Sequence, residues 1–442
     1  MTRLRKTRLA VNLCRLNNFC EIGYNLSSMI DIKLIRENPK EVEKGIKAKG
    51  VKADIDVIFK LDEKRRALQT EADTLRQGRH DKDTDREVAK KQKEELKAKE
   101  AELEAVSRKL EVALLELPNL PRPDVKAGKS DADNEIIKTV GEPPKFNFKI
   151  KDYLELSKIH DLIDMERAAK VSGSRFGYLK NEGVLLEFAL IQYGLHLMLK
   201  NNFIPVVPPV LVGEKAMQGM GYLEHGGEDE TYHFKDEKMF LVGTSEQSVG
   251  PMHMDETLLE KDLPRRYVAF SNCFRREAGS YGKDTKGILR VHQFDKLEMV
   301  VLAAPDKSDE EHEFLLSLEE QLMQGLMLPY QVVKMCTADL GDPAARKYDI
   351  ETWIPSEGKY RETHSCSTTT DFQSRRLNIR YKSADGKPQF VHMLNGTVFA
   401  IGRTLIAILE NYQQKDGTIE VPKVLQPYMN GVKVISRNSS PS

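Results

Sequence analysis

Two segments in the second half of the chain contain the residue types needed to hold a nucleoside triphosphate beside a small amino acid. The first is Phe274-Arg275-Arg276-Glu277, and the second runs from Arg290 through Phe294 to Glu298. An arginine binds phosphate through two N–H donors, an aromatic ring stacks on a base, and a carboxylate accepts hydrogen bonds from an ammonium or hydroxyl group. For the Arg-x-Glu pattern by itself, a solvated hairpin with cross-strand salt bridges is an equally good explanation.

Both segments predict strands joined by a long loop. Val268-Ala269-Phe270 and Leu289 to Met299 are rich in β-branched, aromatic and apolar residues, and Ala278 to Asp284 between them is typical of a turn. Because side chains alternate between the faces of a strand, one polar face would carry Arg290, His292, Phe294, Lys296 and Glu298.

Two further segments add oxygen ligands and an anion site. Arg361-Glu362-Thr363-His364-Ser365-Cys366-Ser367 places a carboxylate three residues before a hydroxyl group, a pair of hard ligands suited to Mg²⁺ held by phosphates. Leu394-Asn395-Gly396-Thr397 precedes an apolar helix from Ala400 to Tyr412. Gly402 would let the backbone approach a ligand closely, and Arg403 would point from the helix start toward an anion.

These segments resemble motifs 2 and 3 of the class II aminoacyl-tRNA synthetases, and with Gly243-Thr244-Ser245-Glu246 they resemble the seryl-tRNA synthetases of bacterial type. A weaker motif 1 is present in the helical run Leu185 to Leu199 and the proline-containing run Asn202 to Val212. In that family, motif 1 builds the interface of a homodimer. The resemblance extends from about Met29 to about Lys433.

The resemblance implies an α+β fold. A long antiparallel two-helix coiled coil at the N-terminus would be followed by a class II synthetase catalytic domain, whose antiparallel β-sheet is flanked by helices. The implied activity is ATP-dependent attachment of L-serine to tRNA(Ser) through a seryl-adenylate intermediate, with tRNA(Sec) as a further candidate. The serine carboxylate attacks phosphorus directly, so the protein would mainly position and neutralise its substrates.

The resemblance also assigns roles to individual residues. Arg275 would hold the α-phosphate and the serine carboxylate, and Arg290 and Arg403 the outer phosphates. Phe294 would stack on adenine. Glu362 and Ser365 would ligate Mg²⁺. The implied catalytic residues are Arg275, Glu277, Arg290, Glu362 and Arg403. The implied ATP site comprises Arg275, Arg276, Glu277, Arg290, Phe294, Glu362, Thr363, His364, Ser365 and Arg403.

The implied serine site is built to hydrogen-bond a hydroxyl group. Such a site rejects alanine because its own polar groups would be left unpaired. The chain departs from the family at Thr397, where serine is common, and at His364, where a smaller residue is common. A structural role is the alternative for His364. The implied serine-binding residues are Thr244, Ser245, Glu246, Arg275, Glu298, Asn395 and Thr397.

The charged region from about Asp54 to Leu117 predicts two long helices. Leucines recur every seven residues in two series, with another seam residue in each heptad. Residues 77–81 would form the turn between the helices, and prolines from Pro118 onward end the second one. At about 1.5 Å per residue, helices of about thirty residues make a rod about 45 Å long. The seam residues are Ile58, Leu61, Arg65, Leu68, Ala72 and Leu75, then Leu96, Leu103, Val106, Leu110, Ala113 and Leu117.

In the resembled family such a rod reaches the long variable stem of tRNA. RNA duplexes are read largely through backbone and 2′-hydroxyl contacts. The net charge of zero argues against a wholly basic coat, so contact with RNA would be local. For any single cation, a solvated position paired with a nearby acid is the better explanation. The cations of the rod are Lys64, Arg65, Arg66, Arg76, Arg79, Arg86, Lys90, Lys91 and Lys93.

We divide the chain into five parts on these patterns. The region around Pro118 to Pro144 has little apolar periodicity and is typical of a linker. No Gly-x-Gly-x-x-Gly follows a strand, which excludes a Rossmann domain. The parts are an N-terminal extension over 1–28, expected to be disordered, a tRNA-binding helical arm over 29–128, a linker over 129–150, the catalytic domain over 151–433 and a C-terminal tail over 434–442.

The basic N-terminal extension leaves two locations open. Its cations precede any acidic residue, as in an organellar transit peptide. The favoured alternative is a translated upstream stretch, because the run from Met29 to Pro39 resembles the start of the family, and it predicts a cytoplasmic protein. No apolar run approaches the length of a membrane span, so we expect no membrane contact. The five cysteines lack zinc-ligand spacing, so we expect reduced thiols and no zinc: Cys14, Cys20, Cys273, Cys336 and Cys366.

Two rival functions stay open at this point. The first is a class II enzyme for another amino acid or for a carrier protein; the two-helix arm argues against the carrier, and Thr244 to Glu246 with Glu298 argue against other amino acids. The second is a non-catalytic RNA-binding or regulatory paralogue. The intact set Arg275, Glu362 and Arg403 argues against that function.

Overall fold

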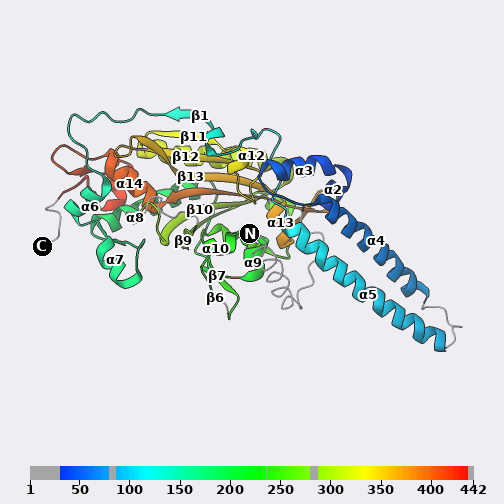
Figure 1. The fold of residues 1–442 in the computed structure, drawn as a ribbon. Coiled ribbons are helices and arrows are strands. Elements are labelled where there is room, and N and C mark those ends of the chain that lie inside the picture. The colour runs from blue at the N-terminus through cyan, green and yellow to red at the C-terminus, as the bar shows by residue number, and fades with distance from the viewer. Residues whose placement is uncertain (1–29, 79–85, 235, 279–286, 437–442) are drawn as a thin grey trace.

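The computed structural model describes residues 30–78, 86–234, 236–278 and 287–436. An eight-stranded sheet forms the body, and a pair of long helices projects from it (Figure 1). Within this sheet, neighbouring strands are antiparallel except β4 and β9, which are parallel. The strand order is β1 (Glu135–Val140), β11 (Tyr330–Lys334), β12 (Arg346–Ile354), β13 (Lys359–Thr370), β16 (His392–Ala400), β10 (Gln293–Ala303), β9 (Arg265–Phe274) and β4 (Ile204–Val206).

One continuous core joins this sheet to three helices, α8 (Glu182–Lys200), α12 (Ser308–Leu326) and α14 (Ile401–Asn411). The second half of β10 is buried at every position. A strand covered on both faces needs apolar residues at nearly every position, and Leu297 to Ala303 supplies such a run, interrupted only by Glu298. The expected α+β class, with an antiparallel sheet flanked by helices, is thus confirmed.

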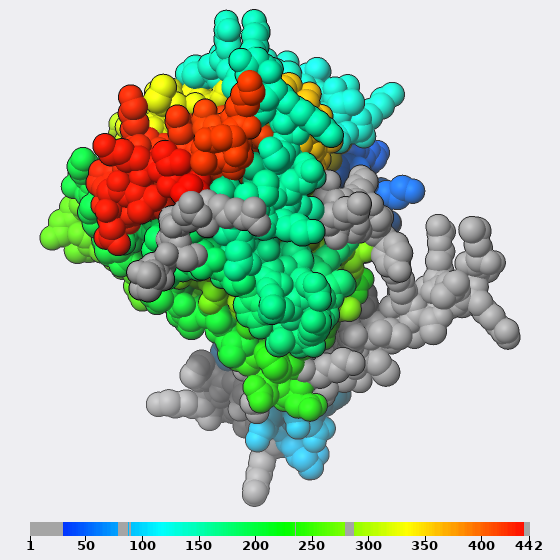
Figure 2. All heavy atoms as spheres, turned by 90° about the vertical axis from the view of Figure 1, so that its left-hand side faces the viewer, coloured from blue at the N-terminus to red at the C-terminus, as the bar shows by residue number. Residues whose placement is uncertain are grey.

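Smaller elements surround the main sheet. On the face shown in Figure 2, the C-terminal segment packs beside α8, where His196 Nδ1 lies 2.8 Å from the hydroxyl of Tyr428. The short helices are α6 (Tyr153–His160), α7 (Met165–Ser172), α9 (Glu214–Gly219), α10 (Gly227–Glu230), α11 (Glu246–Val249) and α13 (Phe372–Leu377). The short strands are β2 (Ile163–Asp164), β3 (Tyr178–Leu179), β5 (Leu211–Gly213), β6 (His233–Phe234), β7 (Met239–Leu241), β8 (Thr257–Leu259), β14 (Arg380–Lys382), β15 (Pro388–Phe390), β17 (Ile419–Glu420) and β18 (Val434–Ile435).

The N-terminal domain contains two short helices, α2 (Ile32–Glu37) and α3 (Pro39–Ala48), and two long ones, α4 (Ile55–Gly78) and α5 (Arg86–Leu115). The long helices lie side by side and antiparallel (Figure 1), joined by ion pairs such as Lys64–Glu102 at 2.9 Å. The heptad seam is largely as expected, because these seam residues are buried: Ile58, Leu68, Ala72, Leu96, Val106 and Leu110.

Several expected boundaries differ from the structure. Leu117 lies beyond the end of α5 and belongs to a core at the base of the arm. The linker over 129–150 contains β1, which pairs with β11 and extends the main sheet. Val434 and Ile435, assigned to the tail, pair with β17, and Ile435 is fully buried.

Other expectations fall wholly or partly outside the described residues. These are disorder over 1–28, most of the turn at 77–81 and most of the loop at 278–284, as well as the thiols of Cys14 and Cys20. Cys273, Cys336 and Cys366 are buried free cysteines.

Helix α8 corrects the expectation that no apolar run in the chain approaches the length of a membrane span. Among the described residues it is the one helix that is long and apolar enough to cross a bilayer, by length and composition alone. Its apolar character has a structural cause, because Leu186, Leu190 and Met198 are fully buried in the main core. The backbone comes so close to the sheet that a Cβ at Gly194 would lie 2.7 Å from Val398.

We expect Leu110→Ala to destabilise the base of the arm. Leu110 is 1% exposed and packs in a cluster with Ile58 and Leu114. Removing a buried leucine side chain from a closed core costs about 2–5 kcal/mol. Denaturant unfolding followed by circular dichroism measures the loss. The exposed neighbour provides the control, since Lys109→Ala should change stability by no more than about 0.5 kcal/mol; equal midpoints for the two variants would contradict the packing described.

Candidate active site

A cavity of about 640 Å³ opens on one face of the main sheet. Side chains two residues apart on the same strand line it, such as Lys296 and Glu298 on β10, and Ser365 and Ser367 on β13, which β16 separates from β10. A smaller hollow beside it shares several lining residues, so the two form one continuous site with two sides. The shared residues are Arg275, Glu277, Arg290, Lys296, Glu362 and Ser365.

Arg275 lies where the two sides meet, one residue beyond the end of β9. Its Nε donates to the carbonyl of Gly243 at 3.2 Å, and its guanidinium lies 5.2 Å from the ring centre of Phe294. The backbone N–H of Arg275 donates to the carbonyl of His292 at 3.0 Å. These contacts orient the guanidinium into the cavity from a rigid strand end.

Arg403 and Glu362 form an ion pair of 3.1 Å in the smaller hollow. Arg403 is in the first turn of α14, as the sequence predicted, where the N–H groups of the helix also favour an anion. A Cβ at Gly402 would lie 3.2 Å from the carbonyl oxygen of Ile288, so glycine allows this close approach. A second pair joins Arg290 Nη1 to Glu277 Oε2 at 2.9 Å.

The surroundings keep Glu362 ionised. Loss of water around this carboxyl would by itself raise its pKa. The positive charges of Arg403 and Lys347 outweigh that effect and hold the pKa below its ordinary value. Lys347 itself pairs with Asp349 at 3.1 Å. The smaller hollow therefore combines fixed positive charge with a carboxylate whose pKa lies below its ordinary value.

Glu362 and Ser365 reach the same hollow because of an irregularity in β13. Residues three apart on a regular strand point to opposite faces. The register between β12 and β13 shifts, since Ile350 pairs with His364 and Glu351 pairs with Glu362. The extra residue at this bulge, Thr363, changes the alternation, and Glu362, Thr363 and Ser365 all line the hollow.

The larger side of the site is lined by buried polar groups. Glu246 is 3% exposed and accepts hydrogen bonds from the hydroxyl of Tyr222 and from Gln373 Nε2, both at 2.8 Å. Glu298 pairs with Lys296 at 2.6 Å. Burial raises the pKa of both glutamates, with Lys296 opposing the shift at Glu298.

The structure brings most of the expected serine-site residues together. Thr244, Glu246, Glu298 and Asn395 line the larger side with Arg275. Thr397 lines the smaller hollow beside Lys296. These side chains come from segments that are distant in sequence, and they converge because β10, β13 and β16 are neighbours in the sheet.

Three expected site residues do not line either side. Ser245 is fully buried and its hydroxyl faces the carbonyl of Ala269. Arg276 is exposed outside the cavity. His364 lies in the core, where its Nε2 is 3.1 Å from the carbonyl oxygen of Val398, and burial lowers its pKa to about 3. Strand alternation past the bulge explains the position of His364, which has the structural role left open above.

Other lining residues were not assigned from the sequence. Strand alternation places Lys296 on the polar face between Phe294 and Glu298, but the resemblance assigns it no role in the site. Tyr222 and Lys347 also line the larger side, but they come from segments without a recognisable motif. The expectation that Arg290 and His292 belong to the strand is wrong, because β10 begins at Gln293.

Comparison with known proteins agrees with this geometry. The family model of the seryl-tRNA synthetase N-terminal domain matches residues 29–121. The model of the class II tRNA synthetase core domain, described for G, H, P, S and T, matches residues 232–412. The two matches correspond to the helical arm and to the part of the body that contains the cavity.

Whole-chain relatives cover both parts. The serine–tRNA ligase of Dictyoglomus turgidum is 46% identical over 418 residues, which cover 91% of this chain and 98% of that protein. The serine–tRNA ligase of Treponema denticola is 43% identical, with 90% of this chain and 98% of that protein covered.

Solved structures match the same extent of chain. The seryl-tRNA synthetase of Pyrococcus horikoshii complexed with ATP has a TM-score of 0.86 at 39% identity, covering 92% of this chain and 99% of that one. The cytoplasmic serine–tRNA ligase of Naegleria fowleri in complex with AMP has a TM-score of 0.83 at 32% identity, with the same coverage. The chain therefore belongs to the seryl-tRNA synthetases, within the class II aminoacyl-tRNA synthetases.

Proposed function

We propose that this protein attaches L-serine to tRNA(Ser) in two steps, through a seryl-adenylate. The observation that carries the proposal is the continuous site in which Arg275 lies between two chemically different sides. One side offers buried oxygen atoms for a small amino acid. The other offers arginines for a triphosphate, and the relative from Pyrococcus horikoshii was solved with ATP.

In the first step, the carboxylate of serine attacks the α-phosphorus of ATP and pyrophosphate leaves. Arg275 holds the reacting carboxylate and the α-phosphate, while Arg290 and Arg403 hold the outer phosphates. Phe294 stacks on adenine. The protein needs no nucleophile, because orientation and neutralisation of phosphate charge lower the barrier. In the second step, a terminal ribose hydroxyl of tRNA attacks the activated carbonyl and releases AMP.

The oxygen atoms of Glu362 and Ser365 fit Mg²⁺, since both are hard donors in the smaller hollow and Glu362 stays ionised. The ion would supply positive charge against the phosphate oxygens. Glu277 would contribute to the base or amino-group contacts through its position beside Arg290. That no zinc is required stays a prediction from the cysteine spacing.

Serine is selected by groups that need a hydroxyl partner. Thr244, Glu246 and Glu298 are nearly fully buried. An alanine substrate would leave part of their hydrogen-bonding capacity unused, beyond the bonds that Glu246 and Glu298 already have within the protein. Thr397 narrows the site beside Lys296. Threonine as a substrate would be excluded because its additional methyl group would not fit the amino-acid side of the site.

The partners and location follow the family resemblance. We propose a homodimer, recognition of tRNA(Ser) by the helical arm and tRNA(Sec) as a further candidate substrate. We place the protein in the cytoplasm, as the name of the Naegleria fowleri relative states for that protein. An organelle is the alternative if residues 1–28 act as a transit peptide.

Loss of either central arginine should reduce serine-dependent pyrophosphate exchange. Arg275→Ala and Arg403→Ala should each lose about 2–4 kcal/mol of transition-state stabilisation, which is about 30- to 1000-fold in rate. The matched control is Arg276→Ala, because Arg276 is exposed and outside the cavity. Comparable exchange in Arg275→Ala, Arg403→Ala and the control would exclude this site. Exchange driven by another amino acid instead of serine would support the rival class II activity.

Sedimentation of the purified protein should show a dimer that depends on an apolar surface around α8. Phe188 is 55% exposed and Val207 is 83% exposed. Other exposed apolar residues on the same elements or next to them are Leu185, Leu199 and Ile204. Exposed apolar residues that gather into a patch mark a protein–protein contact. Phe188→Asp with Val207→Asp should shift the protein toward monomer. Val57→Asp, at an exposed position on the arm, is the control. A wild-type monomer at micromolar concentration that still charges tRNA would refute the dimer.

Shortening the arm should separate tRNA recognition from serine activation. Replacing residues 69–99 by a short glycine-rich turn keeps the core at the arm's base, including Ile58, Leu110 and Leu117. Serine-dependent exchange should stay close to wild type, while transfer to tRNA fails and the salt dependence of tRNA binding becomes weaker. Circular dichroism and dimer state confirm folding first. Efficient charging of tRNA(Ser) by the shortened, folded enzyme would show that the arm has no role in recognition.

A further inference from the structure

Residues 340–345, here called the wall loop, form one side of the larger cavity. Leu340, Gly341, Pro343 and Ala344 line this cavity together with residues proposed to bind serine, such as Thr244 and Glu246. The loop leads directly into β12, which begins at Arg346. Its position therefore affects the width of the amino-acid side of the site.

The wall loop is held through its backbone by a lysine of the N-terminal domain. Lys49, which follows α3, donates from Nζ to the carbonyl oxygens of Gly341 at 2.8 Å, Asp342 at 3.1 Å and Ala344 at 2.6 Å. Three acceptors match the three N–H donors of an ammonium group. Burial lowers the pKa of Lys49 to about 7, and the charge of Asp342 opposes that shift.

The segment that follows the arm binds the remaining carbonyls of the loop. The backbone N–H of Asn119 donates to Asp342 at 2.9 Å, and that of Arg122 donates to Ala345 at 2.9 Å. Asn119 Nδ2 donates to Pro343 at 2.8 Å. Every carbonyl from Gly341 to Ala345 thus accepts a hydrogen bond from the N-terminal part of the chain.

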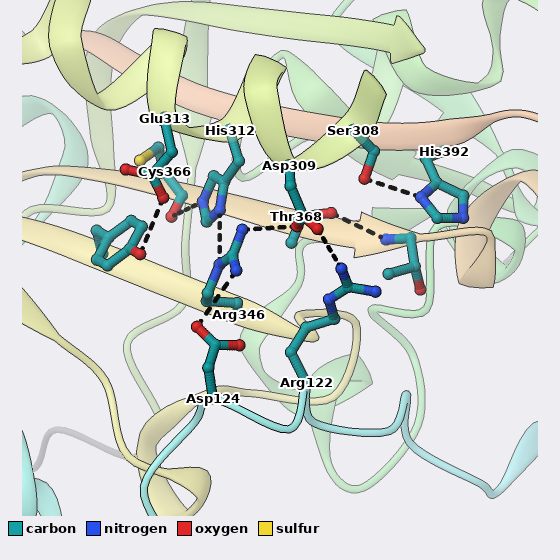
Figure 3. Close-up of polar contacts among 12 residues, drawn as sticks. Arg122, Asp124, Ser308, Asp309, His312, Glu313, Arg346, Cys366, Thr368 and His392 are labelled. Atoms are coloured by element: carbon teal, nitrogen blue, oxygen red, sulfur yellow. Dashed lines mark hydrogen bonds and ion pairs between the residues drawn. The ribbon is translucent and has the colours of Figure 1, made fainter. Parts of the chain in front are cut away.

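Side chains fix the end of the same loop (Figure 3). Arg346 donates to Asp309 at 2.7 Å and to Asp124 at 3.3 Å, and its Nε donates to His312 Nδ1 at 3.2 Å. Arg122 pairs with the other oxygen of Asp309. Figure 3 shows Arg122 and Asp124 reaching these partners from one stretch of chain, so the segment after the arm secures the loop where β12 begins.

We propose that Lys49 is a positioning residue for the amino-acid side of the cavity, and that it acts with Asn119 by fixing the wall loop from the N-terminal domain. The proposal rests on the proposed function, because it concerns the binding of serine to this cavity. Neither residue touches the substrate in this scheme. Both determine the shape of the wall that the substrate meets.

The physical reason is preorganisation. A buried carbonyl group without a hydrogen-bond donor destabilises the fold. The donors to the carbonyls of the wall loop are Lys49, Asn119 and Arg122. Without Lys49 the loop would sample other conformations, and serine binding would have to order it. The loss should then be in the affinity for serine. Simple packing between domains would instead change stability and leave serine affinity alone.

The test is Lys49→Met, which keeps most of the side-chain stem and removes three donors. In pyrophosphate exchange, the KM for serine should rise roughly tenfold, while kcat and the KM for ATP change by less than about twofold. The matched control is Lys47→Met in the last turn of α3, since Lys47 is exposed and pairs with Glu43 at the surface. Asn119→Ala should repeat the selective rise, and it replaces Lys49→Met if that variant does not fold.

The outcomes separate the inference from the function it rests on. An unchanged KM for serine in a folded Lys49→Met or Asn119→Ala enzyme would overturn the positioning role. An equal rise in the KM for serine and the KM for ATP would overturn the positioning role as well, because the wall loop lines only the side of the cavity proposed to bind serine. Absence of serine-dependent exchange in the wild-type protein would instead overturn the proposed function itself.

Discussion

Paired charges inside the cavity are the interaction on which the catalytic domain depends. Glu298 lies 2.6 Å from Lys296, Glu277 lies 2.9 Å from Arg290 and Glu362 lies 3.1 Å from Arg403. Glu298 is 1% exposed, and a carboxylate buried to that extent without such a partner would be strongly destabilising. Lys296 and Glu298 lie on the same face of β10, so a slip of that strand by one residue would turn both toward the opposite face. The other two pairs join different elements, since Arg403 is on α14 and Glu362 on β13, while Glu277 follows β9 and Arg290 precedes β10. The eight-stranded sheet and its apolar helices hold these elements in place.

The sequence predicted features that depend on local spacing. The heptad seam identified Leu68, Ala72 and Leu110 as buried, and strand alternation identified Phe294 and Glu298 as neighbours in the site. Features that depend on partners distant in sequence could not be found in this way. The bulge at Thr363, the burial of His364 and the pairing of β1 with β11 all depend on a neighbouring strand or helix.

The two domains share more than a linker. The core at the base of the arm contains residues from α2, α3, α4 and α5, while Lys49 and Asn119 from the same region bind the wall loop. Arg376 adds a further connection, because it donates to the carbonyl of Leu115 at 2.9 Å and to Glu224 at 3.0 Å. The outer part of the arm is thus separable in structural terms, but its base is part of the catalytic body.

Lys49 and the segment after the arm bind the wall loop through its backbone carbonyl groups. Every amino acid has the same backbone carbonyl, whatever its side chain. Substitutions at Asp342 or Ala344 would leave the acceptors for Lys49 in place, provided that the backbone keeps its path. Gly341, with φ of 73°, is the position where that path favours glycine. Divergence among related sequences can therefore alter the surface that the loop presents to the cavity while the attachment to the N-terminal domain persists.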